Sequence, residues 1–318
     1  MNNKLLKTLK IIFPYVTLAL FIFLIHGFYQ KNIDDFNFLK NLNKIIALKI
    51  LFFAFLYIVT EAVIFIRITR FFKKPVGFFE SFGIMNATYL CNTFVQFSGL
   101  GFRVYYLKKK KDVSITEFIM FSLFTILIEI LTFSFLGLSA ILIFDFFEDS
   151  FEINLYIKLV LTIVFLSCLF VFIFFDKIYK ILGRLLKLKK FKYMKTINSF
   201  FDNSKDMKLT KHLIKLIPIF VIQFVLITLV FYSIYPVFDK PNGLIFSIIS
   251  STLADFSFIF LLTPYSIGIS EFFIYIGTIN FEITIAEILF LMNTFRIAML
   301  VFFFPIGVIY LLKFFKKQ

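Results

Sequence analysis

The sequence predicts an all-α protein: a polytopic membrane helix bundle of about eight transmembrane segments, forming a single membrane domain over residues 1–318. Hydrophobic residues make up 60% of the chain, and the mean hydropathy is +0.94, more than a water-soluble domain of this size accommodates. The apolar runs are continuous and about as long as the roughly 20 residues that a membrane-spanning helix needs. A transmembrane β-barrel would instead show apolar residues alternating with polar ones.

Six apolar runs are regular enough to predict complete spans. They cover residues 11–29, 45–66, 115–143, 155–175, 214–236 and 286–312. The first run follows Lys4, Lys7 and Lys10, but no small-residue cleavage site comes after it, so we expect a retained helix rather than a signal peptide. Two further apolar regions, 81–102 and 244–280, contain polar residues and glycines, which predicts broken or re-entrant helices.

The distribution of charge predicts the orientation of these spans. Most of the 34 basic residues lie in clusters beside the spans, whereas the loop around 144–154 is acidic. The basic clusters cover residues 4–10, 67–74, 103–111, 176–215 and 313–317. By the positive-inside rule we expect these clusters and both termini to be cytoplasmic, in the cell (inner) membrane. Clusters placed between spans indicate membrane topology rather than a nucleic-acid partner.

The longest cluster, 176–215, predicts a basic cytoplasmic amphipathic linker between the two halves of the domain. Its apolar residues recur at helical spacing over 178–186, which favours a helix on the anionic membrane surface. The alternative is a solvated loop with the ordinary charge of a cytoplasmic segment.

The same orientation constrains the two irregular regions. Because 67–74 and 103–111 are both assigned to the cytoplasm, residues 81–102 are expected to enter the membrane and turn back within it. Residues 244–280 must likewise return to the outer side, either as a re-entrant hairpin or as two short spans. Two such regions entering from opposite faces are what an inverted repeat with discontinuous helices predicts.

Several polar residues fall inside the apolar spans, where charge is costly and usually faces protein or water. One helical stripe consists of Ser122, Thr125, Glu129 and Thr132. The stripe predicts either the lining of a polar cavity or a helix–helix contact in which a protonated Glu129 is the donor. Glu61 and Glu117 lie closer to the ends of their spans, and we interpret them as interfacial.

Arginine is the other candidate, because its planar guanidinium suits phosphate. Arg296 lies in the last span, one turn after Asn293, and we expect Glu271 or Asp255 to be its partner. The pair either binds a headgroup or is a structural ion pair. Arg103 lies where the first irregular region meets a basic cluster, so it is either a headgroup ligand or a topology determinant.

Two motifs resemble a known family. The first is Ser98-Gly99-Leu100-Gly101-Phe102-Arg103-Val104-Tyr105-Tyr106-Leu107-Lys108-Lys109, which follows a polar stretch containing Asn92 and Gln96. The second is Pro264-Tyr265-Ser266-Ile267-Gly268-Ile269-Ser270-Glu271, ahead of a final helix with Arg296. They resemble the motifs of the lysylphosphatidylglycerol synthase transmembrane-region family, or flippase-like domain proteins, in which Glu129 also has a counterpart. Two adjacent glycines of the second family motif are Tyr265 and Ser266 here, and the first motif lacks a proline.

The resemblance implies an eight-helix, flippase-like unit that handles aminoacylated phospholipids, glycolipids or polyprenyl-linked sugars. Family members that synthesise lysylphosphatidylglycerol carry an additional aminoacyltransferase domain, which is not in this sequence, so we expect no synthase activity.

We therefore expect a lipid translocator or lipid-binding protein whose partners are membrane lipids with an anionic or polyprenyl-phosphate headgroup. An intramembrane transferase and a non-catalytic partner of an envelope-assembly complex are the alternatives. The two cysteines are far apart and no metal-binding or nucleotide-binding motif is present, so we expect no cofactor and no metal.

Overall fold

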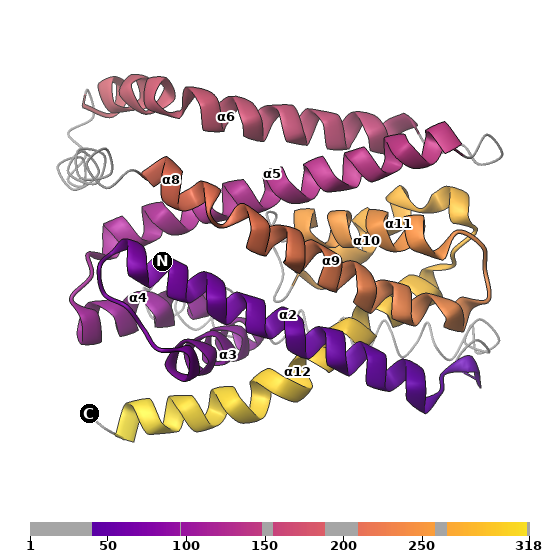
Figure 1. The fold of residues 1–318 in the computed structure, drawn as a ribbon, viewed down its shortest axis with the longest axis horizontal. Helices are drawn as coiled ribbons and strands as arrows, with labels where there is room; N and C mark the ends of the chain where they lie inside the picture. The colour runs from indigo at the N-terminus through magenta and orange to yellow at the C-terminus, as the bar shows by residue number, and fades with distance from the viewer. Residues whose placement is uncertain (1–39, 96, 148–154, 188–208, 258–265, 317–318) are drawn as a thin grey trace, which may run out of the picture. The chain divides into compact units, whose positions relative to one another are not determined.

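The computed structural model describes residues 40–95, 97–147, 155–187, 209–257 and 266–316 (Figure 1). All regular structure in these ranges is helical, in agreement with the predicted fold class. The predicted span at 11–29 and the candidate residue Gln96 lie outside the described residues.

Five segments of the described chain are long and apolar enough to cross a membrane, judged by length and composition. They are 44–71, 115–147, 155–174, 211–238 and 285–314. The helices in these segments are α2 (Lys44–Phe71), α5 (Ile115–Phe147), α6 (Leu155–Lys187), α9 (Ile217–Ile234) and α12 (Ile285–Lys316). Their positions confirm five of the predicted spans, because a continuous apolar run of this length satisfies its backbone hydrogen bonds only as a helix.

The basic linker is helical at both described ends. The helix α6 continues beyond its apolar part to Lys187, and α8 (Leu209–Ile214) precedes α9. Residues 188–208 between them are not described.

The first irregular region forms a helical hairpin of α3 (Phe78–Phe94) and α4 (Ser98–Lys111). Two contacts bring its open ends together: the Tyr106 hydroxyl donates to Glu80, and Lys111 Nζ lies 3.3 Å from the carbonyl oxygen of Pro75. At the closed end, the Gly99 backbone N–H donates to Asn92 Oδ1 over 2.8 Å. The chain thus turns back on itself, as expected for residues 81–102, while the depth of this hairpin in a membrane stays a prediction.

The second irregular region is also a hairpin, made by α10 (Gly243–Ser257) and α11 (Ile269–Gly277). The two helices lie side by side (Figure 1), and the rings of Phe256 and Phe273 are 5.5 Å apart. Lys240, just before α10, donates to the carbonyl oxygen of Glu282, which follows α11, and over 2.9 Å to Glu287 in the first turn of α12. With nine residues, α11 is about 13 Å long and too short to cross a bilayer.

The same order of elements therefore occurs twice in the described chain. A long apolar helix (α2 or α9) is followed by a short-helix hairpin and then by another long helix (α5 or α12). The short 3₁₀ helices η2 (Tyr235–Phe238) and η5 (Ile279–Phe281) flank the second hairpin.

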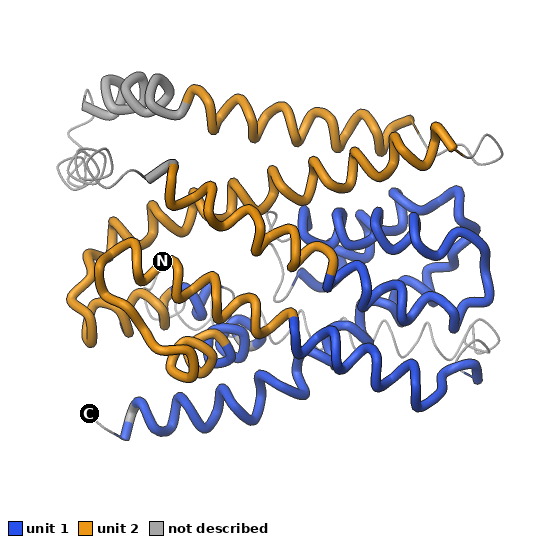
Figure 2. The backbone as a smooth tube through the Cα atoms, viewed as in Figure 1, with its two compact units in different colours: residues 1–56, 86–100, 226–318 blue, residues 57–85, 101–225 orange. Residues whose placement is uncertain are grey.

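The chain forms two compact units that do not follow its sequence halves (Figure 2). One unit, called unit 1 below, comprises residues 1–56, 86–100 and 226–318. The other, unit 2, comprises residues 57–85 and 101–225. Unit 1 contains the second hairpin and α12, whereas unit 2 contains α5, α6 and the open end of the first hairpin.

The hydroxyl groups of the predicted α5 stripe are satisfied within their own helix. The side chains of Ser122, Thr125 and Thr132 are buried and donate to the backbone carbonyls four residues earlier, over 2.7–2.9 Å. Hydroxyl groups used in this way leave the helix surface free to pack closely. Both interpretations of the stripe therefore stay predictions.

Candidate functional site

The described part of the second motif, residues 266–271, forms a tight turn followed by the first turn of α11. Gly268 has φ +86°, a left-handed conformation that glycine adopts without steric cost. Three residues later, Glu271 folds back, and its Oε2 accepts the Gly268 backbone N–H over 2.8 Å. A carboxylate at this position caps the helix N-terminus and interacts favourably with its dipole. The turn therefore fixes the direction of the Glu271 side chain.

Arg296 of α12 meets this carboxylate in a buried, two-pronged ion pair. Its Nη1 donates to Glu271 Oε1, and its Nη2 lies 3.2 Å from Glu271 Oε2. Nη2 also donates to Ser270 Oγ over 2.7 Å, while Asn293 Oδ1 lies 3.5 Å from Nη1. Arg296 is 8% exposed and Glu271 is 7% exposed. Such a fork is geometrically specific as well as strong.

Two polar atoms of this cluster have no hydrogen-bond partner in the described part of the chain. They are Arg296 Nε and Ser266 Oγ, and both are buried. The Ser266 backbone carbonyl lies 3.0 Å from Ser270 Oγ, so both atoms belong to the same network. Buried donors are normally paired, because losing hydration without replacement costs about 1–3 kcal/mol. The cluster thus has hydrogen-bonding capacity available for an additional acceptor.

The family model described as "Lysylphosphatidylglycerol synthase TM region" matches residues 10–307, which is nearly the whole chain. The chain belongs to this family. No curated protein and no solved structure gives a significant match.

Membership of the lysylphosphatidylglycerol synthase TM-region family confirms the resemblance noted from the two motifs. It also establishes a multi-pass membrane protein from a lipid-related family.

The structure brings three of the predicted site residues of this family member together: Glu271, Arg296 and Asn293. Of the two acidic partners expected for Arg296, the ion pair is made by Glu271. Asp255 is half-buried on α10 in the same unit. Asn92, also in unit 1, accepts the Gly99 N–H and so supports the turn of the first hairpin.

Arg103 and Glu129 belong to unit 2. Arg103 is half-buried on α4, and its guanidinium carbon lies 5.9 Å from the centroid of the Phe118 ring, within the range of a cation–π contact. Glu129 is half-buried on α5 beside the satisfied hydroxyls of its stripe. Among the described residues, no three His, Cys, Asp or Glu side chains form a group suited to a metal ion.

One polar contact within the spans was missed from the sequence. Gln223 on α9 is completely buried and donates through Nε2 to Glu61 of α2. Glu61 lies ten residues before the end of α2, and Glu117 lies in the first turn of α5. Their position at the membrane interface stays a prediction. Glutamine within an apolar run was the available signal, because buried amides need a partner.

We expect substitutions of Glu61 and Gln223 to have non-additive effects on the free energy of unfolding. Gln223→Leu should lower the free energy of unfolding by about 1–3 kcal/mol, because it removes the buried amide that donates to Glu61. The double variant Glu61→Leu, Gln223→Leu should be more stable than the summed effects of the two single substitutions predict. Unfolding in mixed detergent micelles measures all four proteins, and strictly additive effects would contradict the coupling.

Proposed function

We propose that this protein binds a lipid headgroup at the Glu271–Arg296 cluster and moves it through the membrane. The observation that carries the proposal is the buried two-pronged ion pair, in which Arg296 Nε has no partner among the described residues. The lipid-related family is consistent with this activity.

Energetics favour a functional reason for this pair. Removing two charges from water is costly, and replacing a buried ion pair with apolar residues of similar volume is often neutral or stabilising. Ionisable groups within membrane proteins accordingly tend to line substrate or ion pathways. An arginine in that setting suits a phosphate or carboxylate, to which it donates two parallel hydrogen bonds.

The geometry suggests how a headgroup would engage. Both terminal nitrogens of Arg296 are occupied by Glu271 and Ser270, so an entering anion first finds the unpaired Nε–H. To gain two hydrogen bonds, the anion must displace the Glu271 carboxylate from the guanidinium. The displaced carboxylate retains the Gly268 backbone N–H as a donor. Competition between the two anions for one guanidinium makes binding reversible, as transport requires.

The test is headgroup translocation in proteoliposomes, together with mass spectrometry of the lipid that co-purifies with the protein. Glu271→Gln removes the competing charge but keeps a side chain that can accept the Gly268 N–H, so we expect tighter retention of the co-purified lipid. We also expect translocation to slow by at least about tenfold, because a 1.4 kcal/mol change in one step has that effect.

The matched control is Glu282→Gln, since Glu282 is an exposed carboxylate that follows α11. Both readouts should be unchanged by this substitution. Wild-type translocation by Glu271→Gln, with the same amount of lipid retained, would remove this carboxylate from the mechanism.

A further inference from the structure

The open end of the first hairpin concentrates positive charge within unit 2. Lys73 and Lys74 precede α3, and Lys108, Lys109, Lys110 and Lys111 end α4. We call these six residues the basic mouth. Five of them are exposed, and Lys111 is half-buried.

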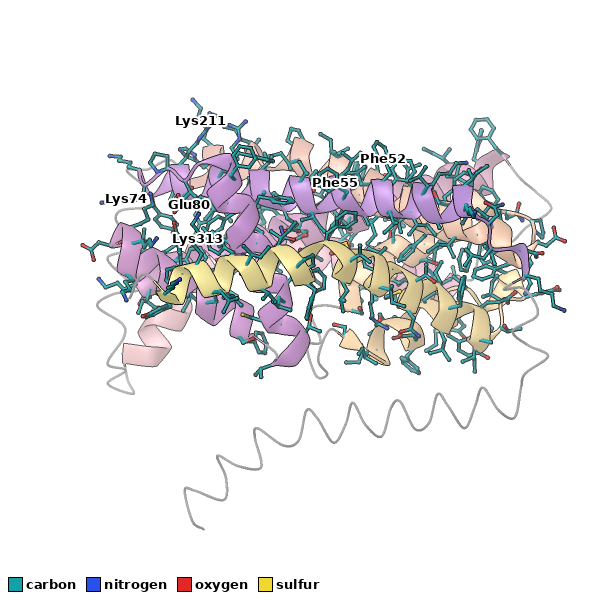
Figure 3. The ribbon with its side chains drawn as sticks, turned by 90° about the horizontal axis from the view of Figure 1, so that it is seen from below. Phe52, Phe55, Lys74, Glu80, Lys211 and Lys313 are labelled. Carbon is teal, nitrogen blue, oxygen red and sulfur yellow. The ribbon has the colours of Figure 1, made fainter. Side chains whose placement is uncertain are left out.

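Contacts join the two segments that carry these lysines, which are the residues before α3 and the end of α4. Lys111 Nζ lies 3.3 Å from the Pro75 carbonyl oxygen, which places the end of α4 against the segment containing Lys74. The pKa of Asp112 is lowered by its 2.7 Å hydrogen bond with Lys108, by the charge of Lys108 and, to a lesser extent, by the charge of Lys74. Figure 3 shows Lys74 at the same end of the unit as Lys211 of α8. The cations therefore act on one region of the surface.

Among the described residues, two carboxylates beside the basic mouth are already engaged. Asp112 is paired with Lys108, and Glu80 accepts the hydroxyl proton of Tyr106. Neither balances the six lysines, so the basic mouth keeps a clear excess of positive charge. A ligand with negative charge would be attracted there.

Exposed apolar residues lie directly beside the basic mouth. Phe79 in the first turn of α3 is 87% exposed, Phe78 is 42% exposed, and Tyr105 on α4 is 43% exposed. A phenylalanine this exposed gains free energy from contact with hydrocarbon. An occupant must therefore offer anionic groups and apolar surface within a few ångströms of each other.

We propose that the basic mouth is a docking site for anionic phospholipid of the adjacent leaflet. The lipid phosphates would interact with the lysines, and the acyl chains would cover Phe78 and Phe79. Clustered basic residues at a membrane surface attract anionic lipids, and amphipathic lysines place their charge at the headgroup level. An acidic soluble protein would satisfy the charges but has no need to cover an exposed phenylalanine pair. The proposal does not depend on the Glu271–Arg296 cluster.

The absence of tryptophan from the sequence allows a direct test with the whole 318-residue chain. Phe79→Trp introduces a single fluorescent reporter beside the basic mouth. Phe146→Trp is the matched reference, because Phe146 is 81% exposed at the end of α5 and follows the acidic Asp145. Each variant is reconstituted in phosphatidylcholine vesicles containing 20% phosphatidylglycerol. In one preparation the phosphatidylglycerol carries brominated acyl chains, and in the other the phosphatidylcholine does.

We expect brominated phosphatidylglycerol to quench the reporter at position 79 about threefold more, per mole of brominated lipid, than brominated phosphatidylcholine does. The reporter at position 146 should show no such preference. Replacing all four lysines at positions 108–111 with glutamine should abolish the preference at position 79. Without these lysine substitutions, a higher salt concentration should weaken the preference.

Equal quenching by the two lipids at position 79 would overturn the proposal, and so would a preference that persists in the four-glutamine variant. If that variant does not reconstitute, the salt dependence of quenching in Phe79→Trp decides instead, and a lipid preference that is unchanged by salt would overturn the proposal.

Discussion

Arg296→Ala is expected to abolish headgroup translocation and to lower the free energy of unfolding by about 3–5 kcal/mol. The stability loss follows because Glu271, which is 7% exposed, would keep its charge without the guanidinium that compensates it. The transport loss follows if the guanidinium is the group that holds the headgroup. Translocation in proteoliposomes and unfolding in mixed micelles measure the two effects separately.

A double substitution separates a structural ion pair from a functional one. Arg296→Met combined with Glu271→Leu removes both charges and fills similar volumes, so we expect stability to return to about the wild-type level. Translocation should remain absent. If the double variant transports normally, the pair has only a structural role. Arg67→Ala is the matched control, because Arg67 is an exposed arginine on the long helix α2 and should have little effect on either measurement.

Gly99→Ala is expected to open the closed end of the first hairpin, whereas Gly101→Ala is expected to be harmless. A methyl group at position 99 would lie 2.3 Å from the Thr88 backbone oxygen and 2.7 Å from Asn92 Oδ1. Because the first of these atoms is backbone, the two helices must move apart to accommodate it. Nothing lies within 4 Å of the corresponding position at Gly101, and alanine has the higher helix propensity.

Limited proteolysis and thermal unfolding of the detergent-solubilised protein test this comparison. Gly99→Ala should lower stability by about 1–3 kcal/mol, in the range typical of overpacking, and should expose the segment at 95–97 to protease. Gly101→Ala should leave both measurements unchanged or slightly increase stability. Indistinguishable behaviour of the two variants would show that the close approach of Gly99 to α3 is not needed.

The sequence by itself determined the membrane class, five spans, the turning back of the first hairpin and the family. These features depend on local properties. An apolar run near 20 residues long has no stable alternative to a helix in lipid, and its boundaries are marked by charge. The capping contact between Glu271 and Gly268 is also short-range, but from the sequence Glu271 was predicted only as a partner of Arg296.

Only the tertiary structure decided which polar side chains meet. Arg296 had two acidic candidates in the sequence, and the packing of α11 against α12 selected Glu271 over Asp255. Glu61 and Gln223 are 162 residues apart, and nothing in their local sequence indicates that α2 and α9 bring them together. Spacing along a helix predicts which face a side chain occupies. The partner of that side chain depends on how helices distant in sequence pack.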